Sequence, residues 1–273
     1  MKNFKNKNAV ITGAGSGIGR ALALSFASRG ANVAISDVNE EGLNETAKLA
    51  QEKGVKVFKK VFDVSSNEAF INFANEVKEM LGDADVVINN AGITHKPIPL
   101  NTLSKEQFEK IMNINFWGMV YGTQAFLPQL KKSETTAVAN VSSVFGLVGM
   151  PYQGAYVASK FAIRGYTEAL ASEMKQLSPK LQVHSIHPGG IKTNIAHSTE
   201  GATEAEKKQM AQTFKITADQ AAAIIVKGIE KNSFRILIGS DAKALDMVTR
   251  ISPFKLFNYG VQKLLKRNAQ ANS

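Results

Sequence analysis

The strongest constraint on the fold is a repeated alternation of short apolar runs with longer segments of helical pattern. The runs that read as strands are 8–12, 32–36, 55–61, 85–89, 136–141, 181–187 and 235–238. Strands joined by helical crossovers lie parallel and carry helices on both faces. The chain has 273 residues, 44% of them hydrophobic, with no long polar linker or internal repeat. We therefore expect one α/β domain over 1–273, a doubly wound three-layer fold around a seven-stranded parallel sheet.

A glycine-rich turn follows the first of these strands and precedes a helical pattern. Its glycines at Gly13, Gly17 and Gly19 have the spacing Gly-x-x-x-Gly-x-Gly, which differs from the commoner Gly-x-Gly-x-x-Gly. Glycines let backbone N–H groups approach a phosphate, and the helix dipole then faces it. A tight bend is the alternative, but the position after an apolar strand favours a pyrophosphate site that includes Ser16 and Ile18.

The second strand ends at Asp37, eighteen residues after Gly19. A carboxylate at this offset accepts hydrogen bonds from both hydroxyls of an adenosine ribose and repels a 2′-phosphate. No lysine or arginine occupies Ala14, Ser16 or Val38, where a basic side chain would offset that repulsion. We therefore predict NAD as the cofactor, with NADP as the alternative. An acid at a strand end is also a common turn residue or helix cap.

Tyr156 and Lys160 are four residues apart in a helical pattern, thirteen residues after Ser143. Residues at this spacing share a helix face, so the ammonium can lie beneath the phenol ring. A phenol has a pKa of about 10, and a lysine together with an oxidised nicotinamide ring is expected to lower it towards neutrality. Tyr156 would then serve as an acid or base for redox chemistry at a carbon–oxygen bond. The alternative is a half-buried aromatic beside a solvated lysine.

Taken together, these segments resemble the short-chain dehydrogenase/reductase family over about the first 195 residues. The matching motifs are Thr12-Gly13-Ala14-Gly15-Ser16-Gly17-Ile18-Gly19, Asp63-Val64, Asn89-Asn90-Ala91-Gly92, Asn115 within Asn113-Ile114-Asn115-Phe116-Trp117-Gly118, Ser143, Tyr156, Lys160, and His187-Pro188-Gly189-Gly190-Ile191-Lys192-Thr193. The resemblance implies a Rossmann fold and an oxidoreductase that transfers a hydride between a nicotinamide cofactor and an alcohol or carbonyl substrate.

The resemblance also implies a catalytic tetrad of Asn115, Ser143, Tyr156 and Lys160. Ser143 would hold the substrate oxygen, and Tyr156 would move the proton. Lys160 would lower the pKa of Tyr156 and bind the nicotinamide ribose, while Asn115 would hold a water that links Lys160 to solvent. Ser142 is the rival for the serine position, and the family spacing of thirteen residues to the tyrosine selects Ser143.

The cofactor site implied by the same resemblance draws on several loops. Its members are Gly13, Ser16, Gly17, Ile18, Gly19, Asp37, Asp63, Val64, Asn90, Ala91, Gly92, Tyr156, Lys160, Pro188, Gly189, Ile191 and Thr193. Asp63 would approach the adenine and Asn90 the adenosine ribose, while Ile191 and Thr193 would hold the carboxamide. For Asn89 and Asn90 a structural role, in which buried amides tie neighbouring strands together, carries equal weight.

The substrate is less constrained by the sequence. Residues 192–214 are expected to form a lid, and Thr94, Phe145, Tyr152, Gly190, Met210 and Phe214 would suit an apolar or lipid-like alcohol or ketone. The same residues are also typical of ordinary packing. Two other functions stay open: a reductase of fatty acyl thioesters such as acyl-coenzyme A, which the basic charge permits, and a dinucleotide-binding sensor without turnover.

The remaining composition bears on compartment and partners. With no cysteine and four scattered histidines, we predict neither a disulfide nor a metal site. No apolar signal segment is evident and no run approaches eighteen apolar residues, so a cytoplasmic protein is expected. The resemblance implies a homodimer or homotetramer. The net charge of +10 permits nonspecific contact with nucleic acid, but no specific nucleic-acid partner is expected.

The C-terminal tail, 250–273, has five basic residues and no acid. One helical face would carry Phe254, Phe257, Val261, Leu264 and Leu265, with lysines and an arginine around it. This pattern is typical of a helix that lies on an anionic membrane surface. The alternative, which we favour, is a helix that packs on the subunit or on a second copy with its lysines in water.

Overall fold

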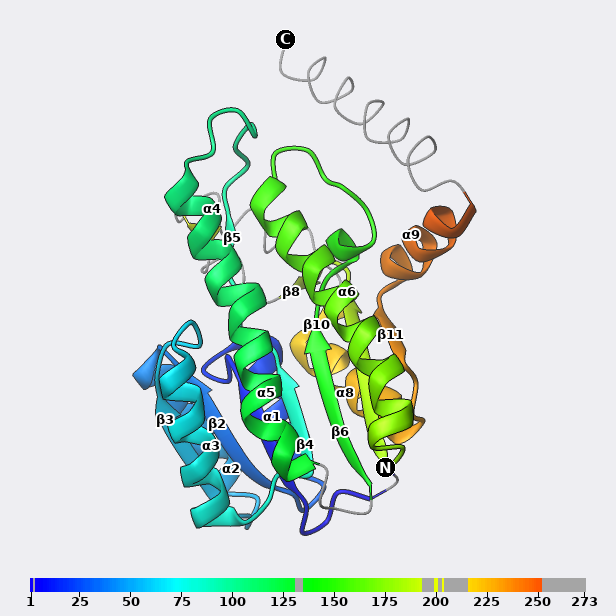
Figure 1. The fold of residues 1–273 in the computed structure, drawn as a ribbon. Helices are drawn as coiled ribbons and strands as arrows, with labels where there is room; N and C mark the ends of the chain where they lie inside the picture. Colours follow the sequence, from blue (N-terminus) through cyan, green and yellow to red (C-terminus); the bar gives the residue numbers. More distant parts are fainter. Residues whose placement is uncertain (2, 131–134, 193–198, 201–202, 204–215, 252–273) are drawn as a thin grey trace.

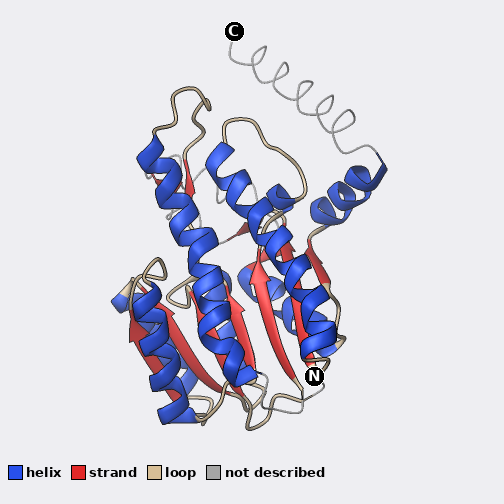
Figure 2. Cartoon of the chain, viewed as in Figure 1, coloured by secondary structure: helices blue, strands red, loops and turns tan. Residues whose placement is uncertain are grey.

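The computed structural model arranges the chain as a central sheet between two layers of helices (Figures 1 and 2). The structure describes residues 1, 3–130, 135–192, 199–200, 203 and 216–251. The sheet has seven parallel strands in the order β11-β7-β6-β4-β1-β2-β3. Their bounds are β1 Asn8–Thr12, β2 Asn32–Asp37, β3 Val57–Val61, β4 Val86–Asn89, β6 Thr136–Val141, β7 Leu181–Pro188 and β11 Arg235–Ile238. The predicted fold class is confirmed.

Alternate residues of each strand face the two helix layers. In β1, Ile11 packs with α1, α2 and α8, whereas Val10 packs with α3, α5 and α6. Because β1 is covered on both faces, its three central residues, 9–11, form a continuous apolar run. The helices that cover the first face are α1 Gly17–Ala27, α2 Glu40–Gln51 and α8 Ala218–Glu230, and those on the second are α3 Asn67–Leu81, α5 Gly118–Leu130 and α6 Gly154–Leu177.

The face that carries α3 and α5 is filled largely by phenylalanines. Phe73 meets Phe126 edge to face at 5.8 Å, and Phe62 meets Phe70 in the same way at 5.1 Å. Such pairs contribute about 0.5–1.5 kcal/mol beyond the burial of their area. They fix α3 and α5 against the strands and thereby place the start of α5 next to the site described below.

Local signals start several helices. The side chain of Asn39 caps α2, that of Ser66 caps α3, and Thr217 with Gln220 forms a capping box at α8. A second capping box starts α4, Lys105–Met112, which continues through a π-helical turn, Asn113–Trp117, into α5. These side chains satisfy N–H groups that a helix leaves unpaired in its first turn.

Smaller elements lie beyond the carboxyl ends of the main strands. β5, Thr94–His95, pairs with β9, Thr199–Glu200, and β8, Ile191–Lys192, pairs with β10, Ile216–Thr217. A 3₁₀ turn, Val144–Gly146, follows β6, and α9, Ser240–Ile251, follows β11. Most of the predicted lid at 192–214 and the tail after Ile251 lie outside the described residues.

Two further observations bear on the sequence predictions. Among the helices of the described part, none has the length and apolar character needed to cross a bilayer. Within the same residues, no group of three or more histidine, aspartate or glutamate side chains is arranged to hold a metal ion.

Candidate active site

The glycine turn is shaped by the absence of side chains. Gly13 has a φ of 66°, a left-handed conformation that suits glycine. A Cβ on Gly19 would lie 2.0 Å from the carbonyl oxygen of Gly13, closer than any side chain tolerates. The start of α1 therefore packs directly on the turn that follows β1.

The N-terminus of α1 is free to receive an anion. Ser16, its N-cap, makes no side-chain hydrogen bond to the first turn among the described residues, and that turn contains no acid. Uncapped N–H groups and the positive end of the helix dipole suit a pyrophosphate. The predicted phosphate-binding residues Ser16, Gly17 and Ile18 all lie here, and a dinucleotide fits this donor set.

Asp37 and Arg20 bind the two backbone groups of Gly15. The Gly15 N–H donates to Oδ2 of Asp37 at 2.8 Å, and the guanidinium of Arg20 donates to the Gly15 carbonyl at 2.6 Å. Asp37 also accepts from the Asn39 N–H at 2.9 Å, so the turn-residue interpretation is partly right. Its two oxygens keep free acceptor positions for ribose hydroxyls.

Arg20 was not singled out in the sequence. Its guanidinium also bonds the Gly42 carbonyl and the Thr46 hydroxyl and pairs with Glu45, which ties α2 to the glycine turn. An arginine in the first turn of a helix normally reads as a solvated residue. Its partners are evident only in the tertiary structure, where α2 packs beside the glycine turn.

Asn89, the last residue of β4, and Asn90, which follows it, make structural contacts. Asn89 donates to Asn140 of β6 at 2.8 Å and to Thr123 of α5 at 3.0 Å. Asn90 donates from its side chain to the carbonyls of Thr12 and Gly13, at 2.9 and 3.2 Å. These bonds fit the strand-linking alternative, and they place Asn90 beside the glycine turn.

The loop after β4 continues along the start of that turn. The N–H groups of Asn90 and Ala91 both donate to the Thr12 hydroxyl at 3.1 Å. After β3, Asp63 is exposed and accepts from the Ser65 N–H at 2.9 Å, and the buried Val64 lies against Gly118. The predicted cofactor residues of these loops thus lie at the carboxyl edge of the sheet.

Asn115 lies in the π-helical turn and is 1% exposed. Its oxygen accepts from the Ile93 N–H at 2.8 Å, and its amide donates to the Ile93 carbonyl and to the Ser159 hydroxyl, at 2.9 and 3.0 Å. Asn115 thus ties the loop after β4 to the helix that carries Tyr156. A Cβ on Gly92 would lie 3.4 Å from Nζ of Lys160, which places that loop against the lysine.

Ser143, Tyr156 and Lys160 lie together. Ser143 hydrogen bonds with Tyr156 and accepts the Phe145 N–H at 3.1 Å. Ser142, the rival serine, is buried and donates to the Lys160 carbonyl at 2.7 Å. The Lys160 ammonium lies 5.5 Å from the centre of the Tyr156 ring and donates to the Val141 carbonyl at 3.0 Å. The contacts therefore place Ser143, and not Ser142, at the phenol.

Burial shifts the pKa values of Tyr156 and Lys160 in opposite directions. Burial raises the pKa of Tyr156 above its usual value, and the hydrogen bond from Ser143 opposes this only in part. Burial also lowers the pKa of Lys160 to about 8. Lys160 is not among the groups that shift the pKa of Tyr156 here, and the lowering expected from this ammonium together with an oxidised nicotinamide stays a prediction. At 8% exposure the phenolate would lose its hydration, and this loss is the larger effect.

The segment after β7 is held by hydrogen bonds from two glycine N–H groups. The Gly189 N–H donates to the Ile238 carbonyl at 2.9 Å, and the Gly190 N–H donates to Asp241 at the same distance. Asp241 was not identified from the sequence, because it comes from α9. Pro188 ends β7 and Ile191 is buried in β8, whereas Thr193 lies outside the described residues.

Among the predicted substrate residues, Phe145 is the one with a described contact to Tyr156. The Phe145 ring meets Tyr156 edge to face at 6.3 Å. Thr94 donates to Gln153, whose amide donates to the His95 carbonyl at 3.0 Å. Tyr152 is 45% exposed. Met210 and Phe214 lie outside the described residues.

Comparison with known proteins agrees with this geometry. The family model for short chain dehydrogenases matches residues 7–231. A putative oxidoreductase SadH of Mycobacterium tuberculosis is 42% identical over 259 residues, 92% of either chain. The 3-oxoacyl-[acyl-carrier-protein] reductase FabG of Thermotoga maritima is 35% identical over 190 residues, 70% of this chain and 76% of that protein.

Solved structures give the same family. A short chain dehydrogenase/reductase from Burkholderia phymatum in complex with NAD has a TM-score of 0.85 at 28% identity and covers 92% of this chain and 95% of its own. An alcohol dehydrogenase from the archaeon Thermococcus sibiricus, complexed with 5-hydroxy-NADP, has a TM-score of 0.71 at 31% identity. The match covers 84% of this chain and 93% of that one. The chain belongs to the short-chain dehydrogenase/reductase family. It is an oxidoreductase that acts on the CH–OH group of small-molecule substrates with a nicotinamide cofactor.

Proposed function

We propose that this chain is an NAD-dependent alcohol dehydrogenase or carbonyl reductase with an apolar or lipid-like substrate. The observation that carries the proposal is the grouping of Tyr156 with Lys160, whose ammonium lies 5.5 Å from the centre of the phenol ring, and with Ser143, which acts on the phenol as a hydrogen-bond donor. This arrangement lies at the same edge of the sheet as the glycine turn and Asp37. This common edge supports a proton donor that acts next to a bound dinucleotide.

The contacts support a role for three residues of the tetrad. The Phe145 N–H occupies one acceptor position of the Ser143 hydroxyl, and the single hydroxyl hydrogen, which serves Tyr156 in this structure, would turn to a substrate oxygen when one is bound. Tyr156 transfers the proton, and its raised pKa keeps it in the protonated form that serves reduction. Lys160 supplies a positive charge beside any phenolate that forms. A bound nicotinamide would donate or accept the hydride.

The choice of NAD over NADP rests on Asp37. Its carboxylate faces Gly15 and has free acceptor positions for ribose hydroxyls, whereas a 2′-phosphate would meet a negative charge. Dissociation constants of NAD and NADP for the wild type and for Asp37→Ala test this. We expect the wild type to bind NAD more tightly and the variant to lose much of that preference. Tighter binding of NADP to the wild type would overturn the choice.

The apolar substrate is supported by Phe145, which stands edge-on to the reacting phenol. The acyl group in the name of the 35% identical reductase from Thermotoga maritima points the same way. An acyl thioester reduced to an aldehyde is the second candidate. We also propose a homodimer or homotetramer, which light scattering of the purified protein measures.

The function is tested by a substrate panel and one substitution. Secondary alcohols, ketones, steroids and acyl thioesters are incubated with each nicotinamide cofactor while its absorbance is followed. Tyr156→Phe is expected to lower turnover about 10²–10⁴-fold and to leave cofactor affinity largely unchanged. Equal turnover in the variant would refute the role of Tyr156. Cofactor binding without turnover of any substrate in the wild type would favour a dinucleotide sensor instead.

A further inference from the structure

His187 is a buried histidine that contacts the backbone of Ser143. It lies near the end of β7 and is 0% exposed. Its Nδ1 is 3.0 Å from the Ser143 carbonyl oxygen, and its Nε2 is 2.9 Å from the Ser185 hydroxyl. None of the proposed catalytic steps uses this side chain.

These two partners determine which ring nitrogen carries the proton. A carbonyl oxygen only accepts hydrogen bonds, so Nδ1 of His187 must be the donor to Ser143. Burial, with smaller effects from neighbouring charges, lowers the pKa of His187 to about 4, and the ring is therefore neutral at pH 7. In a neutral ring with a proton on Nδ1, Nε2 is an acceptor, and Ser185 donates to it.

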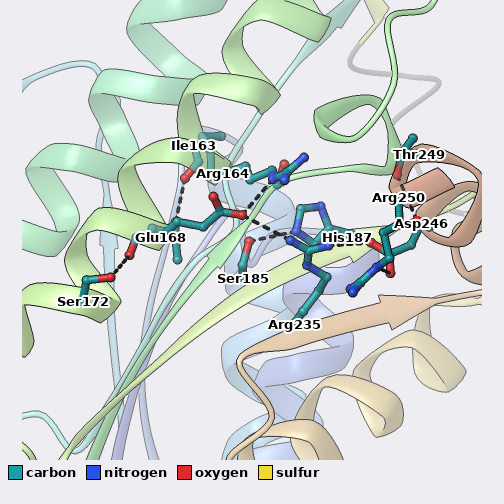
Figure 3. Close-up of polar contacts among 12 residues, drawn as sticks. Ile163, Arg164, Glu168, Ser172, Ser185, His187, Arg235, Asp246, Thr249 and Arg250 are labelled. Carbon is teal, nitrogen blue, oxygen red and sulfur yellow. Dashed lines mark hydrogen bonds and ion pairs between the residues drawn. The ribbon is translucent and has the colours of Figure 1, made fainter. Parts of the chain in front are cut away.

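A network of charged side chains surrounds this histidine (Figure 3). Arg235 of β11 pairs with Asp246 of α9 at 2.6 Å and with Glu168 of α6 at 3.2 Å. Glu168 also binds Arg164 of α6 at 2.8 Å. The guanidinium groups of Arg235 and Arg164 disfavour a positive ring, while Asp246 opposes them more weakly. Arg250 of α9 completes the network by pairing with Asp246 at 2.9 Å.

Ser143 lies just past the β6–β7 pairing, and the residue before it is tied to β7 by the Ser142 N–H, which donates to the Ile186 carbonyl at 2.8 Å. It follows β6 and is the N-cap of the 3₁₀ turn Val144–Gly146. Besides His187, the Gly146 N–H donates to its carbonyl at 3.0 Å, and that bond lies within the same turn. The bond from His187 is thus the contact that ties this carbonyl to a different strand, β7.

We propose that His187 is a positioning residue, which holds the Ser143 backbone through Nδ1–H and so aims the Ser143 hydroxyl at Tyr156 and the substrate oxygen. This inference rests on the proposed role of Ser143. It adds a residue that touches neither substrate nor cofactor but fixes the geometry of one that does. Small misplacements of a catalytic group are costly, because a shift of about 1 Å can reduce the rate about 10²-fold.

Two amide substitutions separate this role from mere packing. The amide nitrogen of His187→Asn can replace Nδ1, whereas that of His187→Gln falls nearer to Nε2 and leaves the Ser143 carbonyl without its donor. We expect kcat to stay within about 3-fold of the wild type in the Asn variant and to fall about 10–100-fold in the Gln variant. NAD dissociation constants should be unchanged in both. Wild-type kcat in both variants, equal losses in both, or a greater loss in the Asn variant would overturn the proposal.

A second measurement does not depend on turnover. Nitrogen-15 NMR of the wild type, with the His187 signal assigned by its loss in the Asn variant, is expected to show a protonated Nδ1 and an unprotonated Nε2 at pH 7. A ring protonated on Nε2, or on both nitrogens, would refute the hydrogen bond itself. If no substrate is turned over, the proposed function fails, whereas the NMR result still decides whether His187 donates to Ser143.

Discussion

The two ends of the site are built by different means. The glycine-turn region, residues 12–20 with Asp37 and Asn90, is shaped by missing side chains and by bonds to backbone groups. The tyrosine region, residues 141–160 with 184–188, contains buried titratable side chains whose pKa values are displaced by burial. Both regions lie at the carboxyl edge of one sheet.

This difference teaches which property each region is sensitive to. In the glycine-turn region a substitution changes the shape of the backbone, and the effect is steric. In the tyrosine region a substitution changes the free energy of burying a charge or of moving a proton, so its effect depends on pH. Substitutions combined with pH therefore separate the two regions.

The largest effect is expected for Lys160→Met, which removes the ammonium beside Tyr156 at similar size. Turnover should fall about 10²–10⁴-fold, because a phenolate would lose the ammonium that lies beside it. Lys175→Met, an exposed position on the same helix α6, is the matched control and should leave turnover unchanged. Steady-state rates of both variants measure this, and a Lys160→Met enzyme as active as its control would remove the electrostatic role.

The next effect is a loss of stability in acid. The pKa values of His184 and His187 are lowered to about 4, whereas an unfolded histidine titrates near its usual 6.5. Between these values the unfolded chain binds protons that the native protein does not. The free energy of unfolding therefore falls as the pH drops from 6.5 to 4, by up to about 3 kcal/mol for each histidine.

Denaturant unfolding across this range measures the loss. His184→Asn, which keeps a donor for the Ser233 carbonyl, should lose less stability in acid than the wild type, since one titrating group is gone. If the free energy of unfolding had the same pH dependence in the variant and the wild type, His184 would not be a source of the stability loss in acid.

The smallest effects compare two glycines. Gly19→Ala places a Cβ 2.0 Å from the Gly13 carbonyl oxygen and should destabilise the fold by about 1–3 kcal/mol while weakening dinucleotide binding. Gly165, in the interior of α6, has no heavy atom of the described residues within 4 Å of an added Cβ. Gly165→Ala should stabilise by about 0.5–1 kcal/mol through helix propensity. Thermal unfolding gives both signs, and the same sign for both would contradict the steric account.

Much of the fold was predictable because its signals are local. Apolar runs located all seven strands, with the third and fourth starting at Val57 and Val86 instead of 55 and 85. Spacing also selected Ser143 over Ser142, and the contacts at Tyr156 agree with that choice. Arg20, Asp241 and His187 were not given roles, because each acts on a segment that is distant in the sequence or packed from another element.

The sequence alone determined the alternation of strands and helices, the glycine turn and the candidate residues at the strand ends, since these depend on periodicity, spacing and the absence of a Cβ. The tertiary structure alone decided how deeply Tyr156 and Lys160 are buried, and therefore in which direction their pKa values move. It also decided that His187 reaches the Ser143 carbonyl. Burial and long-range hydrogen bonds arise only when distant segments pack together, so no local pattern encodes them.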